Sequence, residues 1–137
     1  MTEQTTELNI PSRLSSIEEA ARAAAQVFTE TGFGEEAAFG MDLAVREAVA
    51  NAILHGNKQD ETKMVEIRLT PSAAALTIEV RDFGAGFDPE SVPDPTDAEH
   101  ILRASGRGIL FMRTFMDQVN WSRHPAGGTV VRMTKNK

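Results

Sequence analysis

The stretch VEIRLTPSAAALTIEV (residues 65–80) decides the fold class of this chain. Its apolar residues alternate with polar ones, first over Val65–Leu69 and then over Leu76–Val80, and Pro71-Ser72 lies between the two runs. Alternation with a period of two places successive side chains on opposite faces of a strand, so both runs predict strands with one buried face. The turn residues between them predict that the strands form an antiparallel hairpin.

Two helices are predicted before this hairpin. Small and apolar residues recur at helical spacing over residues 16–30, and Gly32 follows, as is typical of the residue just after a helix. The run Ser16-Ile17-Glu18-Glu19 has the spacing of a capping box, in which the serine hydroxyl and the glutamate satisfy free N–H groups. The second helix is expected from about Glu35 to His55, with Gly56-Asn57 as its stop.

The remaining elements complete an α+β pattern. We expect a short edge strand over Glu7–Ile10, a helix over Ile109–Met116, and strands over Val119–Arg123 and Thr129–Thr134. This order predicts a two-layer sandwich, with helices packed on one face of a mostly antiparallel sheet. A length of 137 residues is typical of one domain, so residues 1–137 are predicted to form a single domain.

Composition narrows the possible functions. Fourteen Lys and Arg against twenty Asp and Glu give a formal charge of −6, which argues against direct nucleic-acid binding. The absence of cysteine excludes disulfides, thiolate zinc sites and cysteine nucleophiles. The polar, acidic N-terminus does not resemble a signal peptide, and no apolar run approaches the ~20 residues that cross a bilayer. We therefore expect a soluble cytoplasmic protein without membrane contact.

A polar stripe on the second predicted helix is the first candidate for chemistry. Glu47, Asn51 and His55 are spaced four apart, which places them along one side of a helix. Such a stripe is either a solvated face or a ligand-binding one. Asparagine is a mediocre helix former, and the small residues Ala48 and Ala52 would allow another group to approach the backbone closely. These two details favour a ligand.

The second candidate is Asp82-x-Gly84-x-Gly86, which directly follows the hairpin. An ionised carboxylate is only a hydrogen-bond acceptor, so Asp82 could accept from an exocyclic amine such as that of adenine. The two glycines would let a flat ligand lie against the backbone. An ordinary turn after a strand has the same pattern, so both interpretations remain open.

The third candidate is Gly106-Arg107-Gly108, at the start of a predicted helix. Free N–H groups and the positive end of the helix dipole would bind phosphate there, although glycines also precede helices without any chemical role. Arg107 either adds charge against the phosphates or is simply solvated. The long irregular stretch between the second and third candidates is typical of a functional loop, and its residues 89–105 are predicted to form a lid.

The order of these three motifs resembles that of the GHKL (Bergerat-fold) ATP-binding domains. Glu47 to Asn51 is similar to their N box, Asp82-x-Gly84-x-Gly86 to their G1 box, and Gly106-x-Gly108 to their G2 box. Within that superfamily the chain most resembles the anti-sigma factor serine/threonine kinases. Their pattern E-A-x-x-N-A-x-x-H-G is matched from Glu47 to Gly56, and GRGILFMRTFMD (residues 106–117) is similar to their G2 helix.

The resemblance implies a role for each candidate residue. Asn51 would bind Mg²⁺, Asp82 would bind adenine, and Glu47 would act as general base on a substrate hydroxyl. The glycines of the G1 and G2 boxes would contact the nucleotide and its phosphates. Further nucleotide contacts are expected from three residues: His55, Arg107 and Thr129.

The implied activity is that of an ATP- and Mg²⁺-dependent protein serine/threonine kinase. Its substrate would be a small anti-sigma factor antagonist of the STAS type, and in its other state the protein would sequester a sigma factor. The same resemblance makes a homodimer one possible assembly.

Two other functions stay open at this point. The first is a nucleotide-sensing binding module that transfers no phosphate, and the second is the detached catalytic domain of a two-component histidine kinase. Glu47 argues against the second, because a histidine acceptor needs less help in losing a proton than a serine hydroxyl. A P-loop enzyme is excluded, since the chain lacks the pattern G-x-x-x-x-G-K-[ST].

Overall fold

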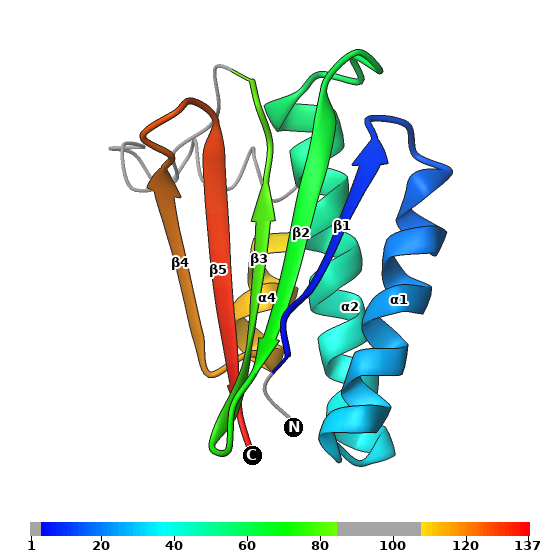
Figure 1. Ribbon diagram of the computed structural model, residues 1–137, viewed down its shortest axis with the longest axis vertical. Coiled ribbons are helices and arrows are strands. Elements are labelled where there is room, and N and C mark those ends of the chain that lie inside the picture. Colours follow the sequence, from blue (N-terminus) through cyan, green and yellow to red (C-terminus); the bar gives the residue numbers. More distant parts are fainter. Residues whose placement is uncertain (1–3, 85–107) are drawn as a thin grey trace.

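The computed structural model describes residues 4–84 and 108–137, with the side chains of residues 108–111 left out. In this part of the chain, helices cover one face of a five-stranded antiparallel sheet (Figure 1). The elements are β1 (Thr6–Pro11), α1 (Ser16–Thr31), α2 (Glu35–Asn51), the π-helix η1 (Ala52–Gly56), β2 (Met64–Pro71), β3 (Ala75–Arg81), α4 (Gly108–Phe115), β4 (Gln118–Arg123) and β5 (Thr129–Asn136). The predicted α+β fold is confirmed.

The sheet has the strand order β1-β2-β3-β5-β4, so β1 lies at one edge and the last strand inserts between β3 and β4. The predicted hairpin is β2–β3, with Ile67 opposite Val80 and Leu69 opposite Ile78. The predicted edge strand is β1, which pairs only with β2 among the described strands. A mostly antiparallel sheet was predicted, and all neighbouring strands in the described part of the chain are antiparallel.

The core lies between the sheet and the helices. Every second residue of β2 and β3 is buried, as alternation in these strands predicted. Small residues of α1 and α2, such as Ala20, Ala24, Ala44 and Ala48, are also buried, which lets the helices pack closely on the sheet. The polar residues between the buried strand positions lie on the opposite face, which the described helices do not cover (Figure 1).

The two ends of α1 differ from each other in how well the sequence predicted them. The predicted capping box at Ser16 is absent. Ser15 is the N-cap residue, and its side chain makes no capping hydrogen bond. Ser16 is the first helical residue and is buried. A preceding turn satisfies the first free donors instead, because the N–H groups of Ser16 and Ile17 donate to nearby carbonyls at 2.9 and 3.1 Å. The predicted end was right, since Gly32 has the left-handed conformation with φ 91°.

The second predicted helix is not one uniform α-helix. It is α-helical up to Asn51 and then widens into the π-turn η1, where the Asn57 N–H donates to the Ala52 carbonyl, five residues back, at 2.8 Å. π-turns frequently occur at functional sites, because the wider turn re-aims the side chains around it. This one follows Asn51 directly and contains His55, the last residue of the polar stripe.

α4 packs against α2 at a point of very close approach. A Cβ added to Gly40 would lie 2.6 Å from Cδ1 of Phe115, so the last residue of α4 occupies the space that the glycine leaves. This contact fixes the end of α4 against the helix that carries the polar stripe. None of the helices in the described ranges is long and apolar enough to cross a membrane.

Candidate functional site

A small cavity lies between α2, η1 and the sheet, where β3 ends and β5 begins. It has a volume of about 20 Å³, which is enough for a water molecule. The residues that line it come from the helical layer and from three strands or their ends: Ala48, Asn51, Ala52, Gly56, Val80, Asp82, Trp121, Thr129 and Val131. Three of the predicted site residues, which are far apart in the sequence, therefore meet in one place: Asn51, Asp82 and Thr129.

Asp82 lines this cavity and is buried, with 6% of its surface exposed. Its Oδ1 accepts from the N–H groups of Gly84 at 3.0 Å and Thr129 at 3.3 Å. Burial raises the pKa of Asp82, while these two hydrogen bonds and the nearby charges of Arg123 and Arg81 oppose the rise. The result is a buried carboxyl group held by two backbone donors through one oxygen.

Glycines allow the segments around Asp82 to come close together. A Cβ on Gly56 would lie 2.2 Å from Asp82 Oδ2, and one on Gly84 would lie 1.7 Å from the Gly56 carbonyl oxygen. Gly128, with φ +87°, would place a Cβ 1.9 Å from the Asp82 carbonyl oxygen. We expected Gly84 to leave room for a ligand; the structure shows that its missing side chain leaves room for the backbone of η1.

The Asn51 side chain is buried, and neither its Nδ2 nor its Oδ1 has a hydrogen-bond partner in the part of the chain that the structure describes. The same holds there for Thr129 Oγ1 and His55 Nε2. Buried polar atoms almost always have a partner, so such a group indicates a bound molecule or ion. The amide oxygen of Asn51 is a ligand type that Mg²⁺ accepts, and Mg²⁺ usually completes its shell with waters and phosphate oxygens. The residues therefore fit a magnesium nucleotide.

Of the other predicted site residues that the structure describes, Glu47, His55 and Gly84 are not among those that line this cavity. Glu47 lies one turn before Asn51 and is half-buried, and burial raises the pKa of its carboxyl group. His55 lies in η1, and Gly108 is the first residue of α4. Gly86, Gly106, Arg107 and the predicted lid of residues 89–105 lie outside the described residues.

The described residues hold no group of three or more acidic or histidine side chains that could bind a metal by itself. A cation at Asn51 would therefore need ligands from the nucleotide. This is consistent with the way Mg²⁺ binds with phosphate oxygens at other nucleotide sites.

The sequence predicted Asn57 only as part of the stop of a helix, because it directly follows Gly56. It is buried, and its side-chain amide bonds to three separate segments of the chain. No local pattern marks a buried asparagine of this kind, since its partners come from distant positions.

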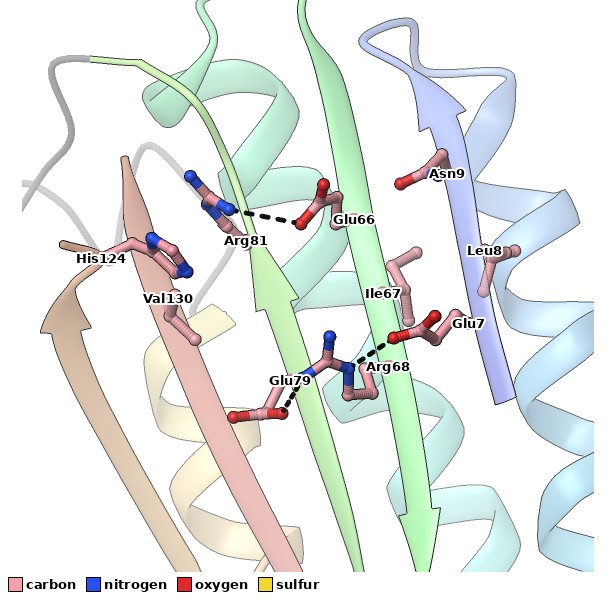
Figure 2. A pocket seen from close by; sticks show the side chains of 10 residues that line it. All are labelled: Glu7, Leu8, Asn9, Glu66, Ile67, Arg68, Glu79, Arg81, His124 and Val130. Carbon is pink, nitrogen blue, oxygen red and sulfur yellow. Dashed lines mark hydrogen bonds and ion pairs between the residues drawn. The ribbon is translucent and has the colours of Figure 1, made fainter. Parts of the chain in front are cut away.

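A larger hollow lies on the opposite face of the sheet (Figure 2). Cross-strand ion pairs occupy it: Arg68 pairs with Glu7 at 2.8 Å and with Glu79 at 3.9 Å, and Arg81 pairs with Glu66 at 3.5 Å. Charges that are paired at an exposed surface are typical of a solvated sheet face. The buried, unpartnered groups around Asp82 thus make the smaller cavity the better candidate site.

The structure thus defines an α+β domain in which a buried asparagine amide of a helix and a buried aspartate at the end of an antiparallel sheet line the same cavity. The family model of the histidine kinase-like ATPase domain matches residues 10–135, and the chain belongs to this family. Membership confirms the resemblance to the GHKL domains and implies ATP binding.

Relatives of this chain carry a more specific name. Over 94 residues it is 38% identical to the anti-sigma F factor of Thermoanaerobacter sp. (strain X514), a match that covers 67% of this chain and 65% of the relative. It is 36% identical to the anti-sigma F factor of Bacillus subtilis (strain 168), with 67% of this chain and 64% of the relative covered. It is 37% identical to the anti-sigma F factor of Clostridium perfringens (strain SM101 / Type A), with 67% of each chain covered. The matched part thus spans about two thirds of the length of these relatives.

Proposed function

We propose that this protein is an ATP- and Mg²⁺-dependent protein serine/threonine kinase that acts in the cytoplasm as an anti-sigma factor. Its substrate is a small anti-sigma factor antagonist of the STAS type, and in its other state it sequesters a sigma factor. The family supports the nucleotide, and the names of the relatives support the sigma factor. The kinase activity and its substrate class follow from the resemblance of the N box, from Glu47 to Gly56, to that of the anti-sigma factor kinases.

One observation carries the proposal: the buried Asn51 amide, which lacks a partner among the described residues, shares a cavity with the buried Asp82 carboxyl group. In the proposed complex Asp82 would accept from the adenine amine, and the Asn51 oxygen would be a ligand of Mg²⁺. Thr129 Oγ1 is a further polar group in the same cavity for the nucleotide. When bound, Mg²⁺ supplies positive charge against the phosphate oxygens, which is most of what phosphoryl transfer requires.

Glu47 is the proposed general base. It lies one turn of α2 before Asn51, so its carboxylate would lie near a phosphate held by an Mg²⁺ ion at Asn51. As the serine or threonine oxygen forms its bond to the γ-phosphorus, the bond from that phosphorus to the bridging oxygen of ADP breaks. The hydroxyl proton passes to the Glu47 carboxylate. Burial raises the pKa of Glu47, which makes its carboxylate a stronger base for the hydroxyl proton.

The test is a transfer assay with γ-labelled ATP, Mg²⁺, the full chain and a candidate STAS-type antagonist. We expect an acid-stable phosphoester on serine or threonine of the antagonist. Nucleotide binding without transfer would instead indicate the binding module, and an acid-labile phosphohistidine on a partner would indicate the histidine kinase domain.

Two glutamate variants separate the base from general effects of charge. Glu47→Gln is expected to bind ATP and to lose transfer by about 100-fold or more, because general-base catalysis contributes on the order of 10²–10⁴. Glu79→Gln makes the same chemical change on the opposite face of the sheet. Glu79 pairs there with Arg68 at 3.9 Å, and its replacement should leave transfer unchanged. Transfer by Glu47→Gln at the wild-type rate would remove Glu47 from the mechanism.

A further inference from the structure

The buried side chain of Asn57 joins three segments that are distant in the sequence. Only 2% of its surface is exposed. Its Nδ2 donates to Ser12 Oγ at 2.8 Å, between β1 and α1, and to the Met64 carbonyl at 3.1 Å, at the start of β2. Its Oδ1 accepts from the Phe83 N–H at 2.8 Å, in the turn after β3. The amide thus uses both its donor and its acceptor group.

The π-turn η1 brings Asn57 to this position. The Asn57 N–H closes the wide turn on Ala52, and the Gln59 N–H donates to the Ile53 carbonyl at 2.7 Å. Lys58 and Gln59 then take left-handed conformations, with φ 54° and 60°. Non-glycine residues hold such conformations where the surrounding structure forces them to, which shows that this segment is tightly determined.

The hydrogen bond from the Phe83 N–H to Asn57 holds the residue that lies between Asp82 and Gly84. Phe83 follows Asp82, whose carboxyl group is buried at the cavity, and precedes Gly84, which packs against the Gly56 carbonyl. Asn57 is itself the next residue after Gly56 in the chain. One asparagine therefore holds the Asp82–Gly84 turn against the end of η1, while its other bonds anchor it to β2 and to the segment before α1.

We propose that Asn57 is a positioning residue of the nucleotide site: it fixes the turn that presents Asp82 to the adenine. This inference rests on the proposed function, though only on its nucleotide-binding part. Asn57 is absent from the residues that line the cavity, so it acts through Phe83 and does not itself touch the ligand. Its loss is expected to reduce the affinity for adenine nucleotides by more than its effect on stability would explain.

The experiment compares Asn57→Ala with a control variant, Val27→Ala, by calorimetric titration with ADP and by urea unfolding. Val27 is buried in α1, away from the cavity, so its truncation lowers stability without touching the turn. Both variants are titrated at a temperature at which each is fully folded. Asn57→Ala is expected to weaken ADP binding by about tenfold, the equivalent of one hydrogen bond, and Val27→Ala by less than about twofold.

Each outcome bears on a different part of the argument. If the wild type binds ADP and Asn57→Ala binds it equally well, the positioning role is wrong and the proposed function stands. If the wild type does not bind ADP, both are wrong. If Asn57→Ala does not fold, hydrogen exchange of the wild-type Phe83 amide decides: we expect this amide to be protected about 100-fold or more in the nucleotide-free protein, and free exchange would overturn the inference.

Discussion

Replacing Asp82 by asparagine should separate the function of this residue from its effect on stability. The variant keeps an oxygen that can accept from Gly84 and Thr129, the two backbone donors that Oδ1 now satisfies at 3.0 and 3.3 Å. The remaining group becomes an NH₂, which donates and therefore opposes an adenine amine, itself a donor. The substitution removes the proposed acceptor while the protein's own hydrogen bonds remain.

The size of the expected loss follows from the hydrogen bond that disappears. A hydrogen bond to a charged group contributes about 1.5–3 kcal/mol, and 1.4 kcal/mol corresponds to a factor of ten. ADP affinity should therefore fall about 10- to 150-fold, as measured by calorimetric titration. Glu79→Gln, the corresponding change on the opposite sheet face, is the matched control.

Although Asp82→Asn should bind ADP more weakly, it should gain stability relative to the wild type as the pH rises. Burial raises the pKa of Asp82 above its value of about 3.9 in an unfolded chain. A carboxyl group with a raised pKa binds its proton more tightly in the folded state, so wild-type stability falls as pH rises from that unfolded value through the folded one. Asp82→Asn lacks this titration. Urea unfolding should show the difference between variant and wild type moving in the variant's favour as pH rises from about 4 to 7.

Either of two results would exclude the proposed role of Asp82. Unchanged ADP affinity in Asp82→Asn would mean that the carboxylate does not accept from the nucleotide. A variant that becomes less stable relative to wild type as pH rises would mean that the folded protein favours the charged carboxylate.

Three further predictions concern the helices. Asn51→Ala should change the free energy of unfolding by less than about 1 kcal/mol, because the amide has no hydrogen bond to lose among the described residues. The same variant should lose the difference in ATP affinity that the wild type shows between titrations with Mg²⁺ and with EDTA. Gly40→Ala should destabilise the fold by about 1–3 kcal/mol in urea unfolding, because its Cβ would meet Phe115 at 2.6 Å; Gly34→Ser, with no atom within 4 Å, should not. Phosphate transfer should fall as pH drops below the raised pKa of Glu47, and a flat acid limb in the pH profile of the initial rate would contradict its role as base.

Local patterns were sufficient to predict the elements. The two-residue alternation in β2 and β3 and the helical spacing in α1 depend only on neighbouring residues, and the structure has these elements within a residue or two of the predicted bounds. The motif order also predicted the family correctly. The end of α2 was predicted less well, because a π-turn and an α-turn use the same residue types and differ in which carbonyl accepts each N–H.

The sequence by itself determined the sandwich of helices on an antiparallel sheet, because strand and helix periods are properties of a short stretch of chain. Only the tertiary structure decided that Asn51, Asp82 and Thr129 meet in one cavity, and that Asn57 holds the turn behind it. The partners of a buried polar atom come from whichever distant segments pack beside it, and no local pattern of residues contains that information.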